Sequence, residues 1–99
     1  MKLYSVYILE CENDKLYTGI ATDVERRFQE HLSGKGARFT RINRPLRIVY
    51  CKKIGDRSAA SKEESRIKSL TKIEKLRLIQ EQHNCQGLGG SLDEGHFTA

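Results

Sequence analysis

The sequence has no tryptophan, a single proline and only three cysteines among its 99 residues. Cys11, Cys51 and Cys85 lie far apart, form no CxxC pair and cannot all pair within one chain, which argues against a secreted disulfide framework. No stretch approaches the run of about 18 apolar residues that a membrane helix needs, and the N-terminus lacks the features of a signal peptide. The sequence therefore predicts a cytoplasmic protein that does not associate with a membrane.

A chain of 99 residues holds one domain with its own core and leaves no room for a second globular unit. Hydrophobic residues make up 37% and charged residues 31%, which is the composition of a folded domain rather than of a disordered chain. From Cys85 onward the sequence is rich in glycine, carries few charges and has no periodicity. We expect one domain over residues 1–84 and a flexible C-terminal tail over residues 85–99.

Short runs of Tyr, Val and Ile predict strands, and S/T-x-x-E capping boxes predict the starts of helices. The predicted strands are 3–11, 15–20 and 46–50, and the predicted helices are 22–33, 59–70 and one that begins at the capping box Thr71–Glu74. Gly34 is expected to end the first helix. This order of elements predicts an α+β fold in which a small three-stranded antiparallel sheet is flanked by helices.

The first two strands form a hairpin, and the length of its loop decides which side chains share a face of the sheet. A three-residue loop would place Tyr7 opposite Gly19 and Leu9 opposite Tyr17, with both phenols on one face, whereas a four-residue loop would separate them. Gly19 has no Cβ and would leave a backbone notch beside Tyr7 that fits a phosphate or a water. Taken singly, each tyrosine is typical of a half-buried sheet aromatic.

The net charge of +5 is concentrated in one segment. Residues 35–53 contain seven basic side chains and no acidic one, so the remainder of the chain is slightly acidic. Four arginines recur at every third position through a stretch that also contains two glycines and the proline, which predicts a loop that follows phosphates. The alternative is a loop kept soluble by its charge.

Arg27 and His31 are i, i+4 neighbours at the edge of the apolar stripe of the first predicted helix. At this edge an arginine can pack its stem and present its guanidinium to a phosphate, while Arg26 should point further toward water. The simpler alternative is that both residues only flank an amphipathic helix.

The tripeptides Ser5-Val6-Tyr7 and Tyr17-Thr18-Gly19, followed by Arg27, His31 and Glu64, resemble the GIY-YIG nuclease superfamily. The similarity runs from Tyr4 to Leu76 and looks like that of the compact bacterial branch of stand-alone GIY-YIG proteins. The sequence departs from the literal GIY at two of three positions and from YIG at one, so the joint pattern carries the resemblance. Further motifs that match are Gly34-Lys35-Gly36-Ala37, Gly55-Asp56-Arg57-Ser58 and the run from Ile67 to Lys72.

The resemblance implies an endonuclease that uses a single divalent metal, Mg²⁺ or Mn²⁺, to hydrolyse phosphodiester bonds of DNA or another polynucleotide. Nicked, branched or damaged DNA, as in DNA repair, fits this class, and no small-molecule organic cofactor is implied. The catalytic residues implied by the resemblance are Tyr7, Tyr17, Arg27, His31 and Glu64. The nucleic-acid-binding residues are Lys35, Arg38, Thr40, Arg41 and Lys68.

In the implied mechanism Tyr7 is the favoured general base, with Tyr17 or His31 assisting, and nearby cations must favour its phenolate. Glu64 is the metal ligand; helical geometry does not separate it from Glu63, and the family's spacing before Ile67-Lys68 selects it. Arg27 would offset charge on the phosphoryl oxygens. The alternatives are a nucleic-acid-binding module of the same fold that cuts poorly, and a basic interaction protein whose charge is only solubilising.

Overall fold

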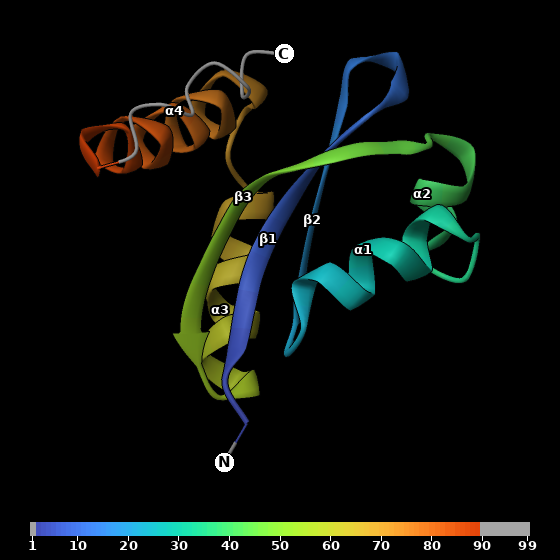
Figure 1. Cartoon of the computed structure of the whole chain (residues 1–99), viewed down its shortest axis with the longest axis horizontal. Helices are drawn as coiled ribbons and strands as arrows, with labels where there is room; N and C mark the ends of the chain where they lie inside the picture. Colours follow the sequence, from blue (N-terminus) through green and yellow to red (C-terminus); the bar gives the residue numbers. More distant parts are fainter. Residues whose placement is uncertain (1, 90–99) are drawn as a thin grey trace. The chain divides into compact units, whose positions relative to one another are not determined.

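The structure is a computed structural model that describes residues 2–89, with side chains to Gln82. The described residues form three strands and four α-helices (Figure 1). In chain order these are β1 (Tyr4–Cys11), a 3₁₀ turn (Glu12–Asp14), β2 (Lys15–Ala21), α1 (Val24–Leu32), α2 (Arg38–Ile42), β3 (Pro45–Gly55), α3 (Arg57–Lys68) and α4 (Lys72–Gly89). No described helix is both long and apolar enough to cross a lipid bilayer.

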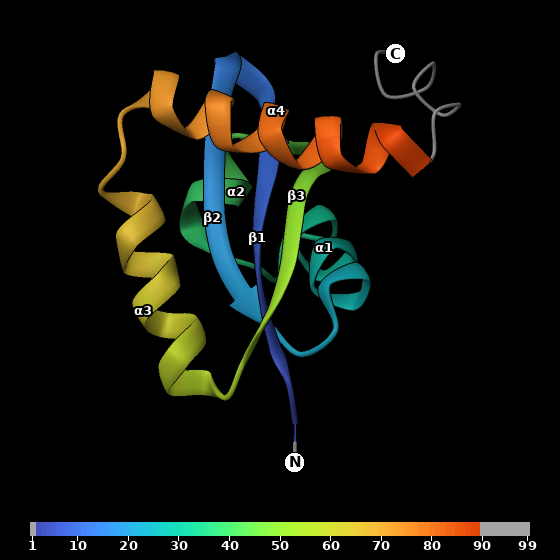
Figure 2. The same cartoon turned by 90° about the vertical axis from the view of Figure 1, so that its left-hand side faces the viewer.

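The sheet is antiparallel with the order β2-β1-β3, which confirms the predicted α+β class. As the central strand, β1 is buried on both faces, and this accounts for its nearly continuous apolar sequence. Two views of the ribbon place α3 on one face of the sheet and α1 with α2 on the other (Figures 1 and 2). Aliphatic side chains of β1 are buried between the sheet and its helices. The full burial of each stabilises the fold by about 1.5–3 kcal/mol.

The hairpin between β1 and β2 turns through Glu12, Asn13 and Asp14, the three-residue loop on which the sequence prediction depended. Asn13 and Asp14 have φ angles of 64° and 60°, a left-handed conformation that Asn and Asp tolerate better than most residues. The backbone N–H of Glu12 donates to the carbonyl of Arg44 at 2.9 Å, which ties the hairpin to the start of β3. The three-residue loop therefore sets the register between β1 and β2.

The N-cap of helix α1 lies one residue later than predicted, because Asp23 rather than Thr22 provides it. A carboxylate oxygen of Asp23 accepts a hydrogen bond from the backbone N–H of Arg26 at 3.1 Å, which satisfies one free donor of the first turn. The helix ends as predicted, with Gly34 at φ 88° directly after it. Helix α3, in contrast, starts two residues before its predicted start, directly after its N-cap Asp56.

The segment before β3 is not the predicted open loop, since Arg38–Ile42 forms the short helix α2. Strand β3 is also longer than the predicted 46–50 and extends to Gly55. The missed helix packs against α1 and covers part of the sheet face that holds the two tyrosines. Helix α2 therefore forms part of the wall of the candidate site.

The chain divides after Ser69 into two compact units within its described part, and α4 belongs to the second. The predicted capping box of α4 is confirmed: Thr71 N–H donates to Glu74 at 2.9 Å, and Glu74 N–H donates to Thr71 Oγ1 at 3.2 Å. The helix continues through Cys85 to Gly89, where the sequence predicted the start of a tail. The rest of that predicted tail, residues 90–99, lies outside the described residues.

Candidate active site

Tyr7 and Gly19 lie opposite one another in the sheet, and Leu9 lies opposite Tyr17, so the predicted register is confirmed. The two tyrosines therefore share the face covered by α1 and α2, with their ring centroids 6.4 Å apart. A Cβ atom built on Gly19 would lie 2.6 Å from Tyr7 Oη and 2.8 Å from Cζ. The Tyr7 ring thus rests directly on the glycine backbone, and its own hydroxyl occupies the notch that the sequence predicted would hold a phosphate or a water.

His31 lies at the centre of this face and is 1% exposed, although the sequence placed it at the edge of the core. Its Nε2 is hydrogen-bonded to Tyr7 Oη at 2.9 Å, and its Nδ1 to Thr40 Oγ1 at 2.7 Å. The Tyr17 ring packs edge-on against the imidazole with a centroid distance of 5.1 Å. The correction follows from α2, which the sequence did not predict and which closes over His31.

Thr40 is 2% exposed, so the direct contact with nucleic acid that the sequence predicted does not fit its position. Its hydroxyl donates to the carbonyl of Ala37 at 2.9 Å and faces His31 on the other side. Gly36 is a further residue that the sequence analysis missed, because a Cβ there would lie 2.0 Å from His31 Nδ1. The only sequence signal for Gly36 was its place in the motif Gly34-Lys35-Gly36-Ala37, and no spacing rule predicts that this glycine contacts His31.

Arg27 reaches the same site from α1, and its side chain is 36% exposed. Its Nη1 donates to Glu30 Oε1 at 2.8 Å, which holds the guanidinium in place. This hydrogen bond raises the pKa of Arg27 and lowers that of Glu30. Arg26 is 77% exposed, as the helical angle predicted, so the two adjacent arginines differ in their access to the core.

Burial raises the pKa of Tyr7 to about 12, and the neighbouring charges of Tyr17 and Glu64 add to the rise. Arg27 opposes it without cancelling it. Arg27 alone therefore does not favour the phenolate as the sequence analysis expected of the nearby cations, because desolvation of the phenol outweighs its charge. Burial, followed by the charge of Arg27, lowers the pKa of His31, so the imidazole is neutral at neutral pH.

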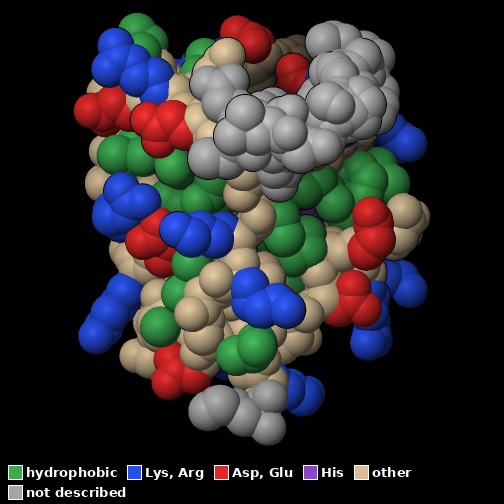
Figure 3. Space-filling view, turned by 60° about the vertical axis from the view of Figure 1, so that its left-hand side comes forward, with side chains coloured by type: hydrophobic (Ala, Val, Ile, Leu, Met, Phe, Trp, Pro, Cys, Tyr) green, Lys and Arg blue, Asp and Glu red, His purple; other side chains and the backbone are tan. Residues whose placement is uncertain are grey.

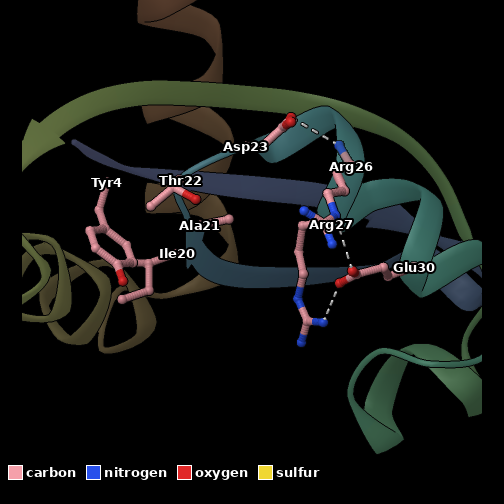
Figure 4. Close-up of a pocket in the computed structure, with 8 residues that line it drawn as sticks. All are labelled: Tyr4, Ile20, Ala21, Thr22, Asp23, Arg26, Arg27 and Glu30. Atoms are coloured by element: carbon pink, nitrogen blue, oxygen red, sulfur yellow. Dashed lines mark hydrogen bonds and ion pairs between the residues drawn. The ribbon is translucent and has the colours of Figure 1, made fainter. Parts of the chain in front are cut away.

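A pocket of about 270 Å³ opens beside Arg27, between the end of β2 and the first turns of α1 (Figure 4). Figure 4 shows the Arg27 side chain extending away from α1, with its guanidinium beside the carboxylate of Glu30. Tyr4 and Ile20 line the opposite side of the pocket. A phosphate bound here would meet a cation that is already oriented by a carboxylate.

Glu64 projects from α3, on the other side of the sheet from α1, yet its charge reaches Tyr7 and contributes to the raised pKa. It forms an ion pair with Lys68 at 3.0 Å. Glu63 instead accepts two hydrogen bonds from Arg66, at 3.0 and 2.6 Å, and these lower its pKa. Both glutamate side chains are 22% exposed, so their charge environment, not their exposure, distinguishes them.

No cluster of three or more His, Cys, Asp or Glu side chains that could hold a metal occurs among the described residues. A closed protein cage for a metal is therefore absent from this part of the chain. A single carboxylate such as Glu64 fits a hard divalent cation that keeps several waters and takes further oxygens from a substrate phosphate. The donor set thus fits a metal that binds together with the substrate.

Three basic residues predicted to bind nucleic acid, Lys35, Arg38 and Arg41, are exposed near α2. None of them forms an ion pair with a carboxylate in the part of the chain that the structure describes. On the surface shown in Figure 3, by contrast, acidic side chains lie next to basic ones. The unpaired cations therefore form a basic patch, which we define as Lys35, Arg38 and Arg41.

Comparison with known proteins identifies the class to which this fold and site belong. The GIY-YIG catalytic domain family matches residues 3–77, which is most of the chain. The chain therefore belongs to the GIY-YIG family, a nuclease superfamily whose members generally use a divalent metal and act on nucleic acid. The resemblance inferred from the joint pattern of the two tripeptides with Arg27, His31 and Glu64 is confirmed.

Among its relatives, the chain is 48% identical over 81 residues to the UPF0213 protein YhbQ of Escherichia coli K12, covering 82% of this chain and 81% of the relative. It is 47% identical over 92 residues to the UPF0213 protein YhbQ of Escherichia fergusonii, covering 93% and 92%. The solution NMR structure of the UPF0213 protein BH0048 from Bacillus halodurans has a TM-score of 0.55 and 36% identity, and the match covers 91% of this chain and 96% of that chain. None of these names states a substrate or a metal.

Proposed function

We propose that this protein is a divalent-metal-dependent endonuclease that hydrolyses phosphodiester bonds of DNA, including nicked, branched or damaged forms. The observation that carries the proposal is the convergence of the Tyr7 hydroxyl, the Tyr17 ring and the His31 imidazole beside the Arg27 guanidinium. Any buried tyrosine hydroxyl needs a hydrogen-bond partner, but the partner of Tyr7 is an imidazole, a group that can also accept the phenolic proton. The cytoplasmic location expected from the sequence is part of this proposal.

Tyr7 acts as the general base toward the attacking water, and the state of its proton explains how. With a pKa of about 12 the phenol is protonated at neutral pH, so it can accept a proton only while it gives up its own. His31 Nε2, at 2.9 Å, is the acceptor that lies within reach. Tyr17 packs against the rings of both Tyr7 and His31.

Arg27 offsets the charge that develops on the phosphoryl oxygens, because its guanidinium opens to the pocket between α1 and β2. Its hydrogen bond to Glu30 orients it before the substrate arrives. Arginine suits this position better than lysine because its planar fork can engage two phosphate oxygens at once.

Glu64 would hold a single Mg²⁺ or Mn²⁺, and that ion would stabilise the leaving oxygen when bound. Its influence on the pKa of Tyr7 supports Glu64 over Glu63, whose carboxylate is engaged by Arg66. Lys68 pairs with Glu64 and is freed to contact a phosphate when the carboxylate turns to the metal. The basic patch grips the flanking phosphates.

A nicking assay tests the proposal, with supercoiled, nicked and branched DNA and with Mg²⁺, Mn²⁺ or EDTA. We expect the wild-type chain to cut only with metal, and Tyr7→Phe to lower the rate by about 10²–10⁴-fold, the range of general-base catalysis. Glu64→Ala should remove the metal-dependent activity. Glu63→Ala is the matched control, since its side chain has the same exposure on the same helix, and it should cut like the wild type.

Equal cleavage by the wild type, Tyr7→Phe and Glu64→Ala would contradict the proposed site. The unpaired charges of the basic patch favour a second candidate function, a module that binds nucleic acid without cutting it. That function predicts metal-independent, strongly salt-dependent binding and no cleavage of any of the DNA forms. The same assay, followed by a binding titration, separates the two.

A further inference from the structure

We propose that Thr40 is a positioning residue, which holds neutral His31 in the tautomer with its proton on Nδ1 so that Nε2 can accept the hydroxyl proton of Tyr7. The catalytic consequence rests on the proposed nuclease function, whereas the tautomer is a property of the folded chain alone. The inference assigns a role to a buried threonine that the sequence analysis placed at the nucleic acid.

The argument starts from the single proton of the Thr40 hydroxyl. The carbonyl oxygen of Ala37 lies 2.9 Å from Thr40 Oγ1 and can only accept hydrogen bonds; it also accepts them from the backbone N–H groups of Thr40 and Arg41. A hydroxyl proton turned away from this carbonyl would leave two oxygens 2.9 Å apart with no hydrogen between them, so the proton points to Ala37. Thr40 Oγ1 therefore meets His31 Nδ1, 2.7 Å away, with a lone pair. Nδ1–H donates to that lone pair, and the proton of the neutral imidazole is located on Nδ1.

The proton on Nδ1 also determines the hydrogen bond at the other ring nitrogen, Nε2. A neutral ring protonated at Nδ1 has a lone pair on Nε2, and Tyr7 Oη lies 2.9 Å from it. The Tyr7 hydroxyl therefore donates to Nε2, which is the direction that proton transfer to His31 requires. In the opposite tautomer Nε2–H would point at Tyr7, and the histidine could not take the phenolic proton.

The ring has little freedom to turn over. Its Nδ1, Cγ and Cε1 face the Gly36 backbone so closely that a Cβ there would lie within 2.0–2.7 Å of them. The Tyr17 and Tyr7 rings contact the imidazole edge-on, at centroid distances of 5.1 and 6.1 Å. Gly36 and the two tyrosines fix the plane of His31, and Thr40 fixes its proton.

The proton transfers balance in this arrangement. The attacking water forms the new O–P bond and gives a proton to the Tyr7 oxygen, while the Tyr7 proton moves to His31 Nε2. The imidazolium that results keeps its Nδ1–H bond to Thr40. As the bond between phosphorus and the leaving oxygen breaks, the proton from Nε2 passes through solvent to that oxygen, and neutral His31 is restored.

NMR tests the tautomer without reference to activity. The chain has three histidines, and the double variant His83→Gln, His96→Gln leaves His31 as the single imidazole. In ¹⁵N-histidine-labelled protein of this background, long-range ¹H–¹⁵N spectra should show a protonated Nδ1 and an unprotonated Nε2. A protonated Nε2 in the neutral ring would overturn the inference.

Thr40 itself is tested by two substitutions in the same background. Thr40→Val keeps the shape of the side chain but removes the acceptor, so the Nε2-protonated form should become populated. Thr40→Ser should retain the Nδ1-protonated form. Thr18→Val is the matched control, because Thr18 is a buried strand threonine whose Oγ1 has no hydrogen-bond partner among the described residues. An unchanged tautomer in Thr40→Val would overturn the role of Thr40.

The catalytic consequence is measured in the nicking assay. Thr40→Val should lower kcat by about tenfold or more with little change in KM, Thr40→Ser should restore most of it, and Thr18→Val should match the wild type. Equal kcat in Thr40→Val and the wild type would overturn the positioning role. Should the wild type cut no DNA, the nuclease proposal would fall, while the spectra would still decide the tautomer.

Discussion

The two faces of the sheet carry the two halves of the candidate site, and they are built differently. On the α1 and α2 face, Tyr7, His31 and Thr40 are almost fully buried and joined by hydrogen bonds of 2.7–2.9 Å. On the α3 face, Glu63 and Glu64 are partly exposed and each is engaged in an ion pair with a flexible basic side chain. Exposed ion pairs contribute about 0–1 kcal/mol and exchange partners readily.

This contrast indicates which half of the site exists before substrate arrives. The proton-handling half is packed into the core and stays in place, since breaking it would leave buried polar groups unpaired. The half that we propose binds metal has a carboxylate, Glu64, whose present partner Lys68 is replaceable. Metal and phosphate together would complete the α3 side, whereas on the other side Tyr7 and His31 are already paired and the buried Tyr7 hydroxyl has only to become accessible to the attacking water.

The largest effect on stability and nicking rate together is expected from Gly36→Ala, which disturbs the packing of buried His31. A Cβ placed 2.0 Å from His31 Nδ1 must displace the imidazole or the backbone, which costs about 1–3 kcal/mol of unfolding free energy. We expect the nicking rate to fall at least as far as in Tyr7→Phe. Urea unfolding and the plasmid assay measure both quantities.

Gly34→Ala is the control for this variant, because its Cβ would meet nothing within 4 Å. It should lose about 1–2 kcal/mol through the left-handed backbone alone and keep its activity. Wild-type stability and activity in Gly36→Ala would contradict the packing of His31 described above.

A pH titration should show the next largest effect. Arg27 and Glu30 from α1 and Tyr7 and Tyr17 from the sheet surround His31, and burial with the charge of Arg27 lowers its pKa. The nicking rate should be level above neutral pH and fall by about tenfold per unit once pH drops below that lowered pKa. Ionisation of Tyr7, with its pKa of about 12, should leave no step near neutral pH.

The free energy of unfolding should also depend on pH through His31. The unfolded chain binds a proton at His31 near pH 6.5 that the folded chain binds only at lower pH, so the unfolding free energy should decrease as pH falls below about 6.5. The change should be smaller in His31→Gln, with His83 and His96 replaced in both proteins. An equal decrease in the two proteins would show that His31 is not the group responsible.

Much of the sheet face that carries Tyr7 and Tyr17 could be predicted from the sequence. Three polar residues between two apolar runs gave the register that opposes Tyr7 to Gly19, because side chains alternate strictly along a strand. The burial of His31 and Thr40 could not be predicted, since it depends on α2, a five-residue helix between glycines and a proline that shows no periodic pattern. The cap at Asp23 was missed because Thr22 offered an equally good capping sequence.

A smaller effect is expected from the basic patch. The double variant Arg38→Gln, Arg41→Gln removes two exposed cations that have no carboxylate partner among the described residues. If each contacts one phosphate, the slope of log K against log salt should decrease by about 1.8 for duplex DNA, while the cleavage rate at saturating DNA stays the same. An unchanged slope would place the DNA elsewhere.

The smallest effect is expected on the metal requirement, from changes to the exposed ion pairs of α3. Lys68→Met frees Glu64 from an exposed ion pair of about 0.3–0.5 kcal/mol, so the metal concentration for half-maximal activity, measured at saturating DNA to offset the lost phosphate contact, should decrease about twofold. Arg66→Met, which frees Glu63 instead, is the control and should not change it. A metal requirement that responds to Arg66→Met and not to Lys68→Met would assign the metal to Glu63.

The central claim is that a metal held by Glu64 and the buried pair of Tyr7 and His31 meet at one phosphate. Paramagnetic broadening by Mn²⁺, measured on the ring protons of both residues with a non-hydrolysable DNA bound, tests it most directly. We predict broadening of both rings that disappears in Glu64→Ala and persists in Glu63→Ala. Rings that stay sharp at saturating Mn²⁺, or that broaden equally without Glu64, would contradict the account.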